Sequence, residues 1–400
     1  MKKITNSEKI ILNTIREYGL ISRLQLSRLL EISVTKVGYI VNNLKKKEMI
    51  QEDVAIFTGG RKSVLLKIKN DIFFAMGIDI GDQAIRIGII DACGNILIKI
   101  KYNYREEDIS GFFISRLVEL ANETLKKINF LWDNIAALGV SIVGFVDENK
   151  GICLFLRGFP ELQNFELVEE LKEKIKIKNI YLTDSVRAMA LAELRYGCCR
   201  ENKNFILVYV GMDLGSGIVI ERKIYSGSRG IVGEISHIYV GESNEMCSCG
   251  NYGCLEVMAS GYSIIKKVKE VTSKGIFSSN NKLFSGKEIV NLPNIVKAAM
   301  SGEKFATNII EKEVDYLAIG ISTMVNLLDP EKVVISGGFI EEAGDFFIKL
   351  LTDGVKAKTI PLIRENVKII KSELDDYNAV VGVATMALDR TFKFLEKIPD

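Results

Sequence analysis

The sequence predicts an α/β protein in which an N-terminal winged helix-turn-helix precedes a larger body of two lobes. Three observations favour this fold class. Positive charge gathers in the first 70 residues, the remainder alternates between apolar strands and amphipathic helices, and a strand–glycine-turn–strand unit occurs twice. With 400 residues, 48% of them hydrophobic, the chain can bury the cores of two or three domains. We expect these domains at 1–70, at 71–195 together with a C-terminal helix 380–398, and at 196–379.

The charge of the chain is unevenly distributed. Residues 1–70 carry 14 Lys and Arg against 6 Asp and Glu, a net +8, whereas the whole chain carries only +2. This asymmetry indicates a polyanionic partner for the N-terminal segment. The first residues, MKKITNSEKI, lack the apolar core of a secretory signal, and no stretch approaches the length of uncharged apolar sequence that spans a bilayer. We therefore expect a cytoplasmic protein with no membrane partner.

The N-terminal segment has the pattern of three short helices followed by a β-hairpin. The helices are predicted over 7–18, 23–30 and 34–47, with Ser22 and Ser33 as N-caps of the second and third. Residues 50–68 then alternate as a small wing around a turn at Gly59-Gly60. Two helices joined by a short turn, the second with a polar exposed face, form a helix-turn-helix.

The third helix and the wing supply the predicted contacts to DNA. Amides and hydroxyls on the exposed helical face can reach base edges, and the neighbouring cations can reach phosphates. The predicted residues are Ser33, Thr35, Lys36, Tyr39, Asn42, Asn43, Lys46, Arg61 and Lys62, with Lys45 and Lys47 as further phosphate contacts. Two alternatives remain open: a three-helix protein-interaction module, and a merely solvated hairpin tip at Gly59-Gly60-Arg61-Lys62.

A cluster of thiols in the second lobe predicts a metal site. Cys247, Cys249 and Cys254 lie within eight residues, and His237, the only histidine, precedes them by ten. This set of soft ligands suits tetrahedral Zn²⁺. A disulfide is less favoured because Cys247 and Cys249 are poorly placed to bridge each other. Simple burial of the thiols is the other alternative, and it is our interpretation of the remaining cysteines, Cys93, Cys153, Cys198 and Cys199.

The motifs that surround this cluster resemble the ROK family of repressors, open reading frames and sugar kinases. Five of them occur in the order of the family: Gly77-Ile-Asp79-Ile-Gly81, Gly211-Met-Asp-Leu-Gly215-Ser-Gly217, Gly233-Glu234-Ile-Ser236-His237 with the cysteines, Asn326-Leu-Leu-Asp-Pro330, and Val333-Val-Ile-Ser-Gly337-Gly338. The resemblance implies a two-lobed fold like that of the actin-like ATPases, with a ligand cleft between the lobes. Within the family, the chain most resembles the xylose and N-acetylglucosamine repressors.

Both glycine turns depart from the family's kinases. The first turn reads Asp79-Ile-Gly81-Asp82-Gln83 where the kinases have Asp-Ile-Gly-Gly-Thr. The second has Met212 and Asp213 where they have threonine and glycine. A carboxylate next to a polyphosphate is electrostatically unfavourable. We therefore interpret both turns as structural rather than phosphate-binding.

The catalytic base is the third departure. Family kinases place this aspartate eight residues before a helical glutamate, and here that position before Glu193 is Ser185, preceded by Asp184. Loss of a general base costs about 10²–10⁴ in rate. An alternative alignment keeps Asp184 as the base, but the inserted residue would rotate the rest of the helix by about 100°.

Other positions implied by the resemblance belong to a sugar-type ligand. Glu234, His237 and Glu256 match residues that hold hexose hydroxyls, while Glu161 stands where the family has an asparagine and Ser236 where it has a glycine. Together with the base position, the candidate effector-binding residues are Asp184, Ser185, Glu234, His237, Glu256 and Glu161.

The leading functional hypothesis is a transcriptional repressor of carbohydrate metabolism genes that is not an enzyme. Its partners would be operator DNA, a sugar or sugar-phosphate effector, and further copies of itself in a homodimer or tetramer. Effector binding would change the spacing of two DNA-binding modules and hence their joint affinity. Two alternatives are an ATP-dependent sugar kinase with an accessory DNA-binding domain, and a DNA-binding protein whose body serves only dimerisation.

Overall fold

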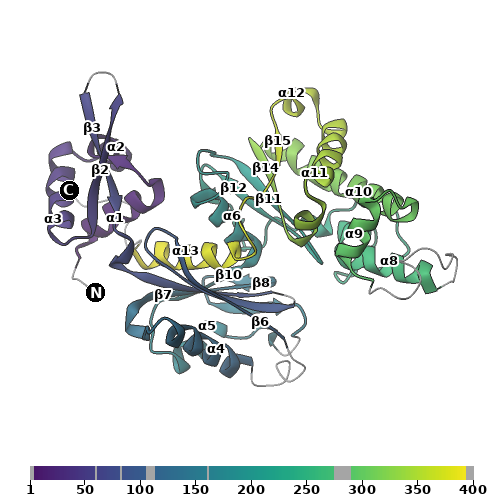
Figure 1. Ribbon diagram of the computed structural model, residues 1–400, viewed down its shortest axis with the longest axis horizontal. Helices are drawn as coiled ribbons and strands as arrows, with labels where there is room; N and C mark the ends of the chain where they lie inside the picture. Colours follow the sequence, from purple (N-terminus) through teal and green to yellow (C-terminus); the bar gives the residue numbers. More distant parts are fainter. Residues whose placement is uncertain are drawn as a thin grey trace. The chain divides into compact units, whose positions relative to one another are not determined.

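The computed structural model describes residues 4–58, 61–81, 83–104, 113–159, 162–273 and 290–392. The chain forms two compact units (Figure 1). Unit 1 comprises Met1–Arg195 and Tyr377–Asp400, and unit 2 comprises Tyr196–Asp376. The N-terminal segment expected as a separate domain thus falls within unit 1.

The N-terminal helices begin where their capping residues dictate. In α1 (Asn6–Tyr18), the Thr5 side chain accepts from the Glu8 amide and the Glu8 carboxylate accepts from the Thr5 amide. The same reciprocal capping by Ser22 and Gln25 opens α2 (Arg23–Leu30), and Ser33 caps α3 (Val34–Lys46). The helix that was predicted to begin at residue 7 therefore begins one residue earlier, at Asn6, with Thr5 as its N-cap.

The hairpin follows the helices as predicted. Strands β2 (Ile50–Thr58) and β3 (Arg61–Ile68) pair antiparallel, and the short β1 (Ile21–Ser22) joins the other edge of β3. The turn at Gly59-Gly60 lies outside the described residues. The inward face of α3 is wholly apolar and buried, and consists of Val37, Ile40, Val41 and Leu44.

The sheet of unit 1 is mixed and has the strand order β10-β7-β4-β5-β6. The first three strands in sequence form an antiparallel meander, and two parallel strands then extend the sheet from β4. Helices α4 (Phe113–Lys127) and α5 (Leu167–Lys174) contribute to the core on one face, and α13 (Asn378–Phe392) covers the other. The strands are β4 (Phe74–Ile80), β5 (Ala84–Ile90), β6 (Ile96–Asn103), β7 (Ile135–Ile142) and β10 (Ile180–Asp184), with a separate ribbon of β8 (Gly144–Asp147) and β9 (Ile152–Leu156).

Unit 2 repeats this topology, since its order β13-β12-β11-β14-β15 again joins a meander to two parallel strands. The duplicated strand–turn–strand pattern of the sequence therefore reflects a duplicated sheet. The strands are β11 (Phe205–Val210), β12 (Leu214–Ile220), β13 (Lys223–Ile224), β14 (Lys332–Ser336) and β15 (Lys368–Lys371). The helices are α7 (Leu255–Ala259), α8 (Gly261–Ser273), α9 (Leu292–Met300), α10 (Lys304–Leu328), α11 (Gly338–Lys358) and α12 (Pro361–Arg364).

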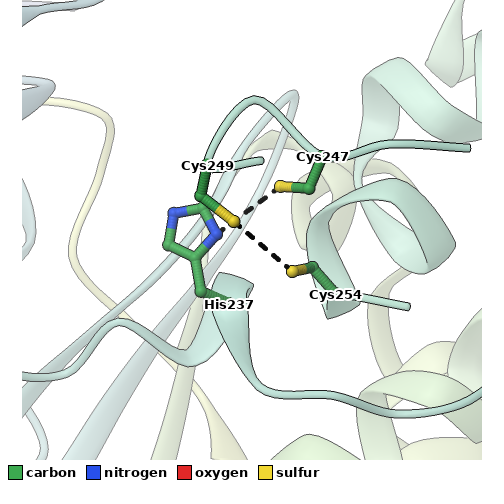
Figure 2. A group of neighbouring side chains, drawn as sticks. All are labelled: His237, Cys247, Cys249 and Cys254. Carbon is green, nitrogen blue, oxygen red and sulfur yellow. Dashed lines mark hydrogen bonds between the residues drawn. The ribbon is translucent and has the colours of Figure 1, made fainter. Parts of the chain in front are cut away.

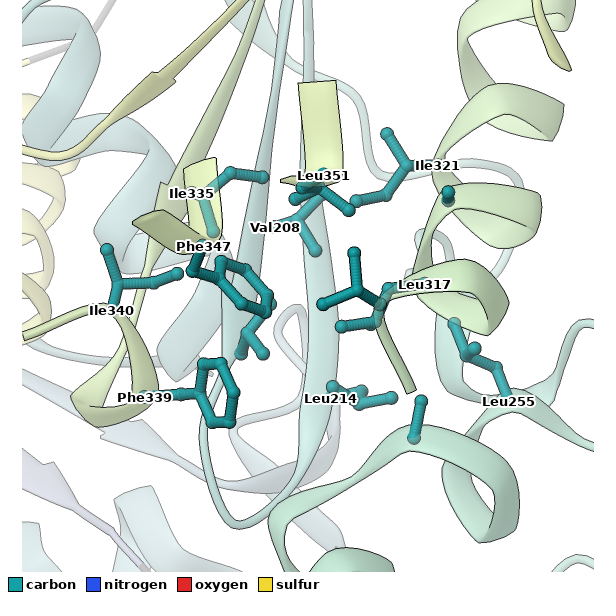
Figure 3. Packing of buried hydrophobic residues seen from close by; sticks show 14 of the residues in the cluster. Val208, Leu214, Leu255, Leu317, Ile321, Ile335, Phe339, Ile340, Phe347 and Leu351 are labelled. Atoms are coloured by element: carbon teal, nitrogen blue, oxygen red, sulfur yellow. The ribbon is translucent and has the colours of Figure 1, made fainter. Parts of the chain in front are cut away.

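The core of unit 2 brings α7, α10 and α11 together with the sheet (Figure 3). Phe347 of α11 is fully buried and stacks edge-on against Phe339 at a ring-centroid distance of 4.5 Å. Leu317 of α10 and Leu255 of α7 belong to the same cluster. Burial of these large side chains fixes α7, which carries part of the candidate site, to the rest of unit 2.

Glycines allow α13 to approach the sheet of unit 1 very closely. A Cβ added at Gly77 of β4 or Gly139 of β7 would overlap the backbone carbonyls of Val380 and Val383 on α13. On the side of α6 (Ser185–Arg195), Gly382 makes the same kind of approach to the carbonyl of Ala188. Helix α13 is thus held against both the sheet and α6 by backbone contact. In the part of the chain that the structure describes, no helix combines the length and apolarity needed to cross a bilayer.

Candidate functional site

The structure brings together the four residues that the sequence predicted as metal ligands. The Nδ1 atom of His237 lies 3.6 Å from the sulfur of Cys247, and the sulfurs of Cys249 and Cys254 are 3.6 Å apart. All four ligand atoms lie within 4.8 Å of one another, and Figure 2 shows the side chains pointing toward a common centre.

The backbone of the loop explains why the thiols converge. The Cys247 amide donates to the Asn251 carbonyl at 2.8 Å, and the Gly250 amide donates to the Cys247 carbonyl at 2.9 Å, so the chain turns sharply between them. Gly250 and Gly253 adopt φ values of +88° and +74°, which favour glycine. At Gly253 a side chain would also collide with the Gly241 carbonyl and the Tyr239 ring.

This geometry fits a tetrahedral metal ion. A zinc–sulfur distance of about 2.3 Å separates two sulfurs in a tetrahedron by about 3.8 Å, close to the separation between Cys249 and Cys254. Cys247 and Cys254 are almost fully buried, and burial raises the pKa of the Cys254 thiol to about 12. Deprotonating buried thiols at neutral pH requires a compensating cation, which a bound divalent metal would supply.

The Cys–His cluster lies next to two of the predicted sugar contacts in unit 2. A short 3₁₀ helix, Ile235–His237, begins directly after Glu234, and His237 is its last residue. The Leu255 amide donates to the Ile238 carbonyl at 2.9 Å, and this bond ties the start of α7, with its buried Glu256, to the same segment. Glu234, His237 and Glu256 are therefore positioned by one small framework.

The far end of α7 is anchored by an ion pair with a buried carboxylate, which the sequence analysis missed. Lys267 of α8 donates to the Met258 carbonyl at 2.8 Å and to the Glu313 carboxylate of α10 at 2.6 Å. Burial raises the pKa of Glu313 to about 6. Nothing in the local sequence links residues 46 positions apart, so only the fold reveals this pair.

In unit 1, the predicted base position is occupied by a hydroxyl that is already engaged. Ser185 is buried at the start of α6 and donates to Oδ1 of Asp79 at 2.6 Å. Ser141 of β7 donates to the same oxygen at 2.8 Å. The carboxylate of Asp79 is thus held by two hydroxyls within the protein.

The alternative base, Asp184, is also engaged, in this case with a cation. Arg187 forms an ion pair with the Asp184 carboxylate through its side chain and donates its backbone amide to it at 2.8 Å. Burial raises the pKa of Asp184, and Arg187 opposes that shift. Glu148 accepts from Arg187 at 3.0 Å and from Thr183 at 2.5 Å, which completes a buried network. The arginine one helical turn after Asp184 was the signal in the sequence that could have revealed it.

The second glycine turn has its backbone bonded within unit 2. The Gly211 amide donates to the Asp213 carbonyl at 3.0 Å, and the Gly211 carbonyl accepts from the Gly261 amide at 2.9 Å. The Met212 carbonyl accepts from Tyr262 at 3.2 Å. The carbonyls of this turn therefore hold the start of α8 in place. In the first turn Asp82 lies outside the described residues, as does Glu161.

The predicted DNA-contacting residues of α3 share its outer face. Thr35, Tyr39, Asn42 and Lys46 are exposed, with Tyr39 at 70%, and Lys36 and Asn43 are half-buried beside them. Ser33 is exposed, but its hydroxyl accepts from the Lys36 amide as the helix cap. The side chains of Arg61 and Lys62 lie outside the described residues.

Two further lysines of this region take part in ion pairs within the protein. Lys47 contacts both carboxylate oxygens of the buried Glu8, at 2.8 and 2.7 Å, and Lys45 contacts Glu52 at 2.8 Å. Burial alone would raise the pKa of Glu8, but the hydrogen bonds from Lys47 and Thr5 bring it below its ordinary value. Lys47 therefore joins α1 to the end of α3, where a phosphate contact was expected.

Comparison with known proteins identifies close likenesses over nearly the whole chain. The profile described as the ROK family matches residues 75–390. A xylose repressor of Caldicellulosiruptor bescii is 26% identical over 97% of this chain and 96% of its own, and an N-acetylglucosamine repressor of Escherichia coli O157:H7 is 28% identical over 92% and 89%. A crystal structure described as a ROK family transcriptional regulator, a homolog of the E. coli MLC protein, covers 98% of this chain and 99% of its own at 25% identity, with a TM-score of 0.80.

An enzyme is also among the relatives, with a different extent of match. A glucokinase of Thermotoga maritima is 27% identical, and the match spans 97% of the glucokinase but only 79% of this chain. The N-terminal region is therefore a feature that this chain shares with the repressors.

Proposed function

Because the chain belongs to the ROK family, we propose that it is a DNA-binding transcriptional regulator, acting as a repressor of carbohydrate metabolism genes. One observation carries the proposal: α3 presents an exposed polar face on a helix-turn-helix with a β-hairpin wing, in a region that the repressor relatives share. A winged helix-turn-helix places such a helix in the major groove. A protein with this role would act in the cytoplasm, where bacterial DNA lies.

We assign base reading to the outer face of α3 and phosphate contact to the cations around it. Asn42 and Asn43 carry amides that can form paired hydrogen bonds with adenine, while Thr35 and Tyr39 offer hydroxyls. Lys46, with Arg61 and Lys62 of the wing, would contact phosphates, and Ser33 and Lys36 would lie at the helix start. Helix-turn-helix proteins read their operators as symmetric pairs, so we expect a homodimer, or a tetramer made of two such dimers.

We propose a sugar or sugar phosphate as the effector. The relatives are repressors named for xylose and for N-acetylglucosamine, so the sugar class is supported while the individual sugar differs among them. The proposed contacts are Glu234, His237 and Glu256 in unit 2, with Asp184, Ser185 and Glu161 in unit 1. Carboxylates and an imidazole can hydrogen-bond to sugar hydroxyls, and of these groups Glu256 is buried whereas Glu234 is exposed.

We propose that the metal is one zinc ion per chain, bound by His237, Cys247, Cys249 and Cys254. Four protein ligands close the coordination sphere, so the ion would be structural and would stabilise the loop between Glu234 and Glu256. Such a site contributes folding free energy when the metal binds.

Sugar phosphorylation is not part of the proposed function. A general base must accept the proton of the attacking sugar hydroxyl. Ser185 has only a neutral hydroxyl, which donates its hydrogen to Asp79, so it cannot act as this base. Asp184 is committed to Arg187, and the second turn has its backbone bonded to α8. A measured ATP-dependent phosphoryl transfer to a hexose at about 1 s⁻¹ or more, the usual kinase range, would favour the kinase alternative.

Selection of duplex DNA from a random library, followed by affinity measurements, tests the proposal. Asn42→Ala or Asn43→Ala should weaken binding to the selected duplex by about 1–3 kcal/mol and affect random DNA much less. Lys46→Ala should weaken both by a similar factor and reduce the dependence of affinity on salt. Lys126→Ala, at the exposed end of α4, is the control and should change neither.

Two results would contradict the proposal. One is the selection of no preferred sequence by the full-length protein. The other is an equal loss of affinity for selected and random DNA in the Asn42 and Asn43 variants, because this would leave α3 without a role in sequence readout.

A further inference from the structure

Three helices of unit 1 meet at a single carboxylate that is largely shielded from solvent. Asp389 of α13 forms an ion pair with Arg16 of α1 through one oxygen and accepts from Arg195 of α6 at 2.9 Å through the other. Arg195 also lies 3.6 Å from Glu17 of α1. The group Arg16, Glu17, Arg195 and Asp389, which we call the joint, links elements from the two ends and the middle of the chain.

The joint is shielded from solvent. The side chain of Arg16 is 4% exposed, that of Arg195 is 9% exposed and that of Asp389 is 16% exposed. Guanidinium groups at such depth need a carboxylate nearby, because an uncompensated buried charge is strongly destabilising. Asp389 is therefore shared by two cations that come from different helices, and the position of each cation depends on the other.

On one side, the joint is connected to the candidate effector residues by α6. This helix begins at Ser185, which donates to Asp79, and ends at Arg195. Gly382 permits backbone contact between α13 and Ala188 in the middle of α6. A helix held in this way moves as a rigid rod, and the chain passes into unit 2 directly after Arg195.

On the other side, the joint is connected to the DNA-facing helix by α1. Lys47, the residue after α3, contacts the buried Glu8 of α1 in the ion pair described above. Ile11 and Ile15 of α1 pack in one apolar cluster with Val41 of α3 and Leu388 of α13. The N-terminal helices therefore share a core with α13, and α1 cannot shift without α3.

We propose that Asp389 is a positioning residue that couples the start of α6 to the orientation of the DNA-binding helices. This inference rests on the proposed function, in which α3 reads DNA and Ser185 lies among the effector contacts. A displacement at Ser185 would move Arg195, and the shared carboxylate would pass the movement to Arg16 and so to α3.

Hydrogen exchange measured by mass spectrometry on the full-length protein tests the coupling without any ligand or DNA. Asp389→Asn should increase exchange in α1 and α3 by about tenfold or more while that of β4 and β7 stays unchanged. Asp133→Asn, a surface change in the same unit, is the control and should leave all of these peptides unchanged. If Asp389→Asn fails to fold, Arg16→Met combined with Asp389→Leu removes both charges and leaves Arg195 beside Glu17.

A double-mutant cycle separates coupling from a purely structural role. Ser185→Ala removes the hydrogen bond at the start of α6, and in the otherwise unchanged protein it should raise exchange in α1 as well as in α6. In the Asp389→Asn background, Ser185→Ala should still affect α6 but no longer affect α1. An equal change of α1 in both backgrounds, or no change of α1 in either, would overturn the proposal.

A measurement with DNA then examines the consequence for readout. Selection from a library with variable distance between two half-sites should yield one preferred spacing for the unaltered protein and a broader range for Asp389→Asn, because a loosened domain accepts more geometries. Failure to select any DNA would count against the proposed function but leave the exchange result intact. A variant that keeps one sharp spacing would count against the joint itself.

Discussion

The two units share one sheet topology but stabilise their candidate sites in different ways. In unit 1 the polar groups at the end of β4 are satisfied within the protein, since Asp79 accepts from Ser141 and Ser185. In unit 2 the corresponding turn, at Gly211 after β11, is bonded through its backbone to α8, and the candidate site lies instead in a later loop that carries His237 and three cysteines. The candidate site of unit 1 is thus held by hydrogen bonds, whereas that of unit 2 combines the apolar packing of α7 with a Cys–His cluster that could hold a metal ion.

The difference shows that a duplicated sheet fixes where side chains lie without fixing their chemistry. A strand–turn–strand unit presents its turn at the same edge in both copies. The residues in that turn, and those in the loops that follow the sheet strands, then decide what each unit binds. Substitutions that remove each kind of support separately should therefore affect one unit and spare the other.

The largest effect is expected from removing the metal ligands of unit 2. Cys254→Ser should lose the bound zinc and lower the free energy of unfolding of unit 2 by at least about 3 kcal/mol, a fraction of the roughly 10 kcal/mol that zinc supplies to small zinc fingers. This corresponds to about 10 °C in melting temperature. Metal analysis and calorimetry, with and without a chelator, measure both quantities.

The control for this substitution is Cys198→Ser, which alters a thiol outside the cluster. It should retain one equivalent of zinc and respond to chelator like the unaltered protein. A Cys254→Ser protein with full zinc content, or freshly purified protein without zinc, would contradict the assignment.

Much of this site could be predicted because its information is local. Ligand identity and spacing over residues 237–254 predict a group that could hold a metal before any fold is known. Charge and capping residues likewise predicted three N-terminal helices, and Ser22 and Ser33 cap α2 and α3 as expected. These features depend on neighbours in sequence.

The contacts that sequence reasoning missed join residues that are distant along the chain. Asp389 pairs with Arg16 and Arg195, and Lys267 pairs with Glu313, across separations that no periodicity encodes. Lys47 was expected at a phosphate because clustered lysines indicate a nucleic-acid face, yet its partner is Glu8, 39 positions away. Burial of a carboxylate depends on the assembled core, which the local pattern does not specify.

A smaller effect is expected from disturbing the helix packing of unit 1. Gly77→Ala places a methyl group against the backbone carbonyl of Val380, which cannot move aside as a side chain would. The free energy of unfolding should fall by about 2–3 kcal/mol, the usual cost of overpacking a core. Denaturant titration of unit 1 measures the loss, and the zinc content should remain unchanged.

Gly38→Ala provides a matched comparison for that substitution. Gly38 lies inside α3 with no atom near the position of an added Cβ, so alanine should stabilise the helix by about 0.5–1 kcal/mol. If both substitutions changed stability alike, close packing of α13 on β4 would not be the cause.

The smallest effect is expected from restoring a carboxylate at the base position, which should produce no phosphorylation activity. Ser185→Asp would place a second carboxylate against Asp79, whose oxygen now lies 2.6 Å from the serine hydroxyl. Two carboxylates at that distance cannot both ionise, so one pKa should rise and the new aspartate would be a poor base at neutral pH. The second turn, with its carbonyls bonded to α8, would also remain unchanged. Phosphorylation assays with ATP and a panel of hexoses should therefore give no turnover for the variant, and a rate of about 1 s⁻¹ would show that the base alone separates this chain from the kinases of its family.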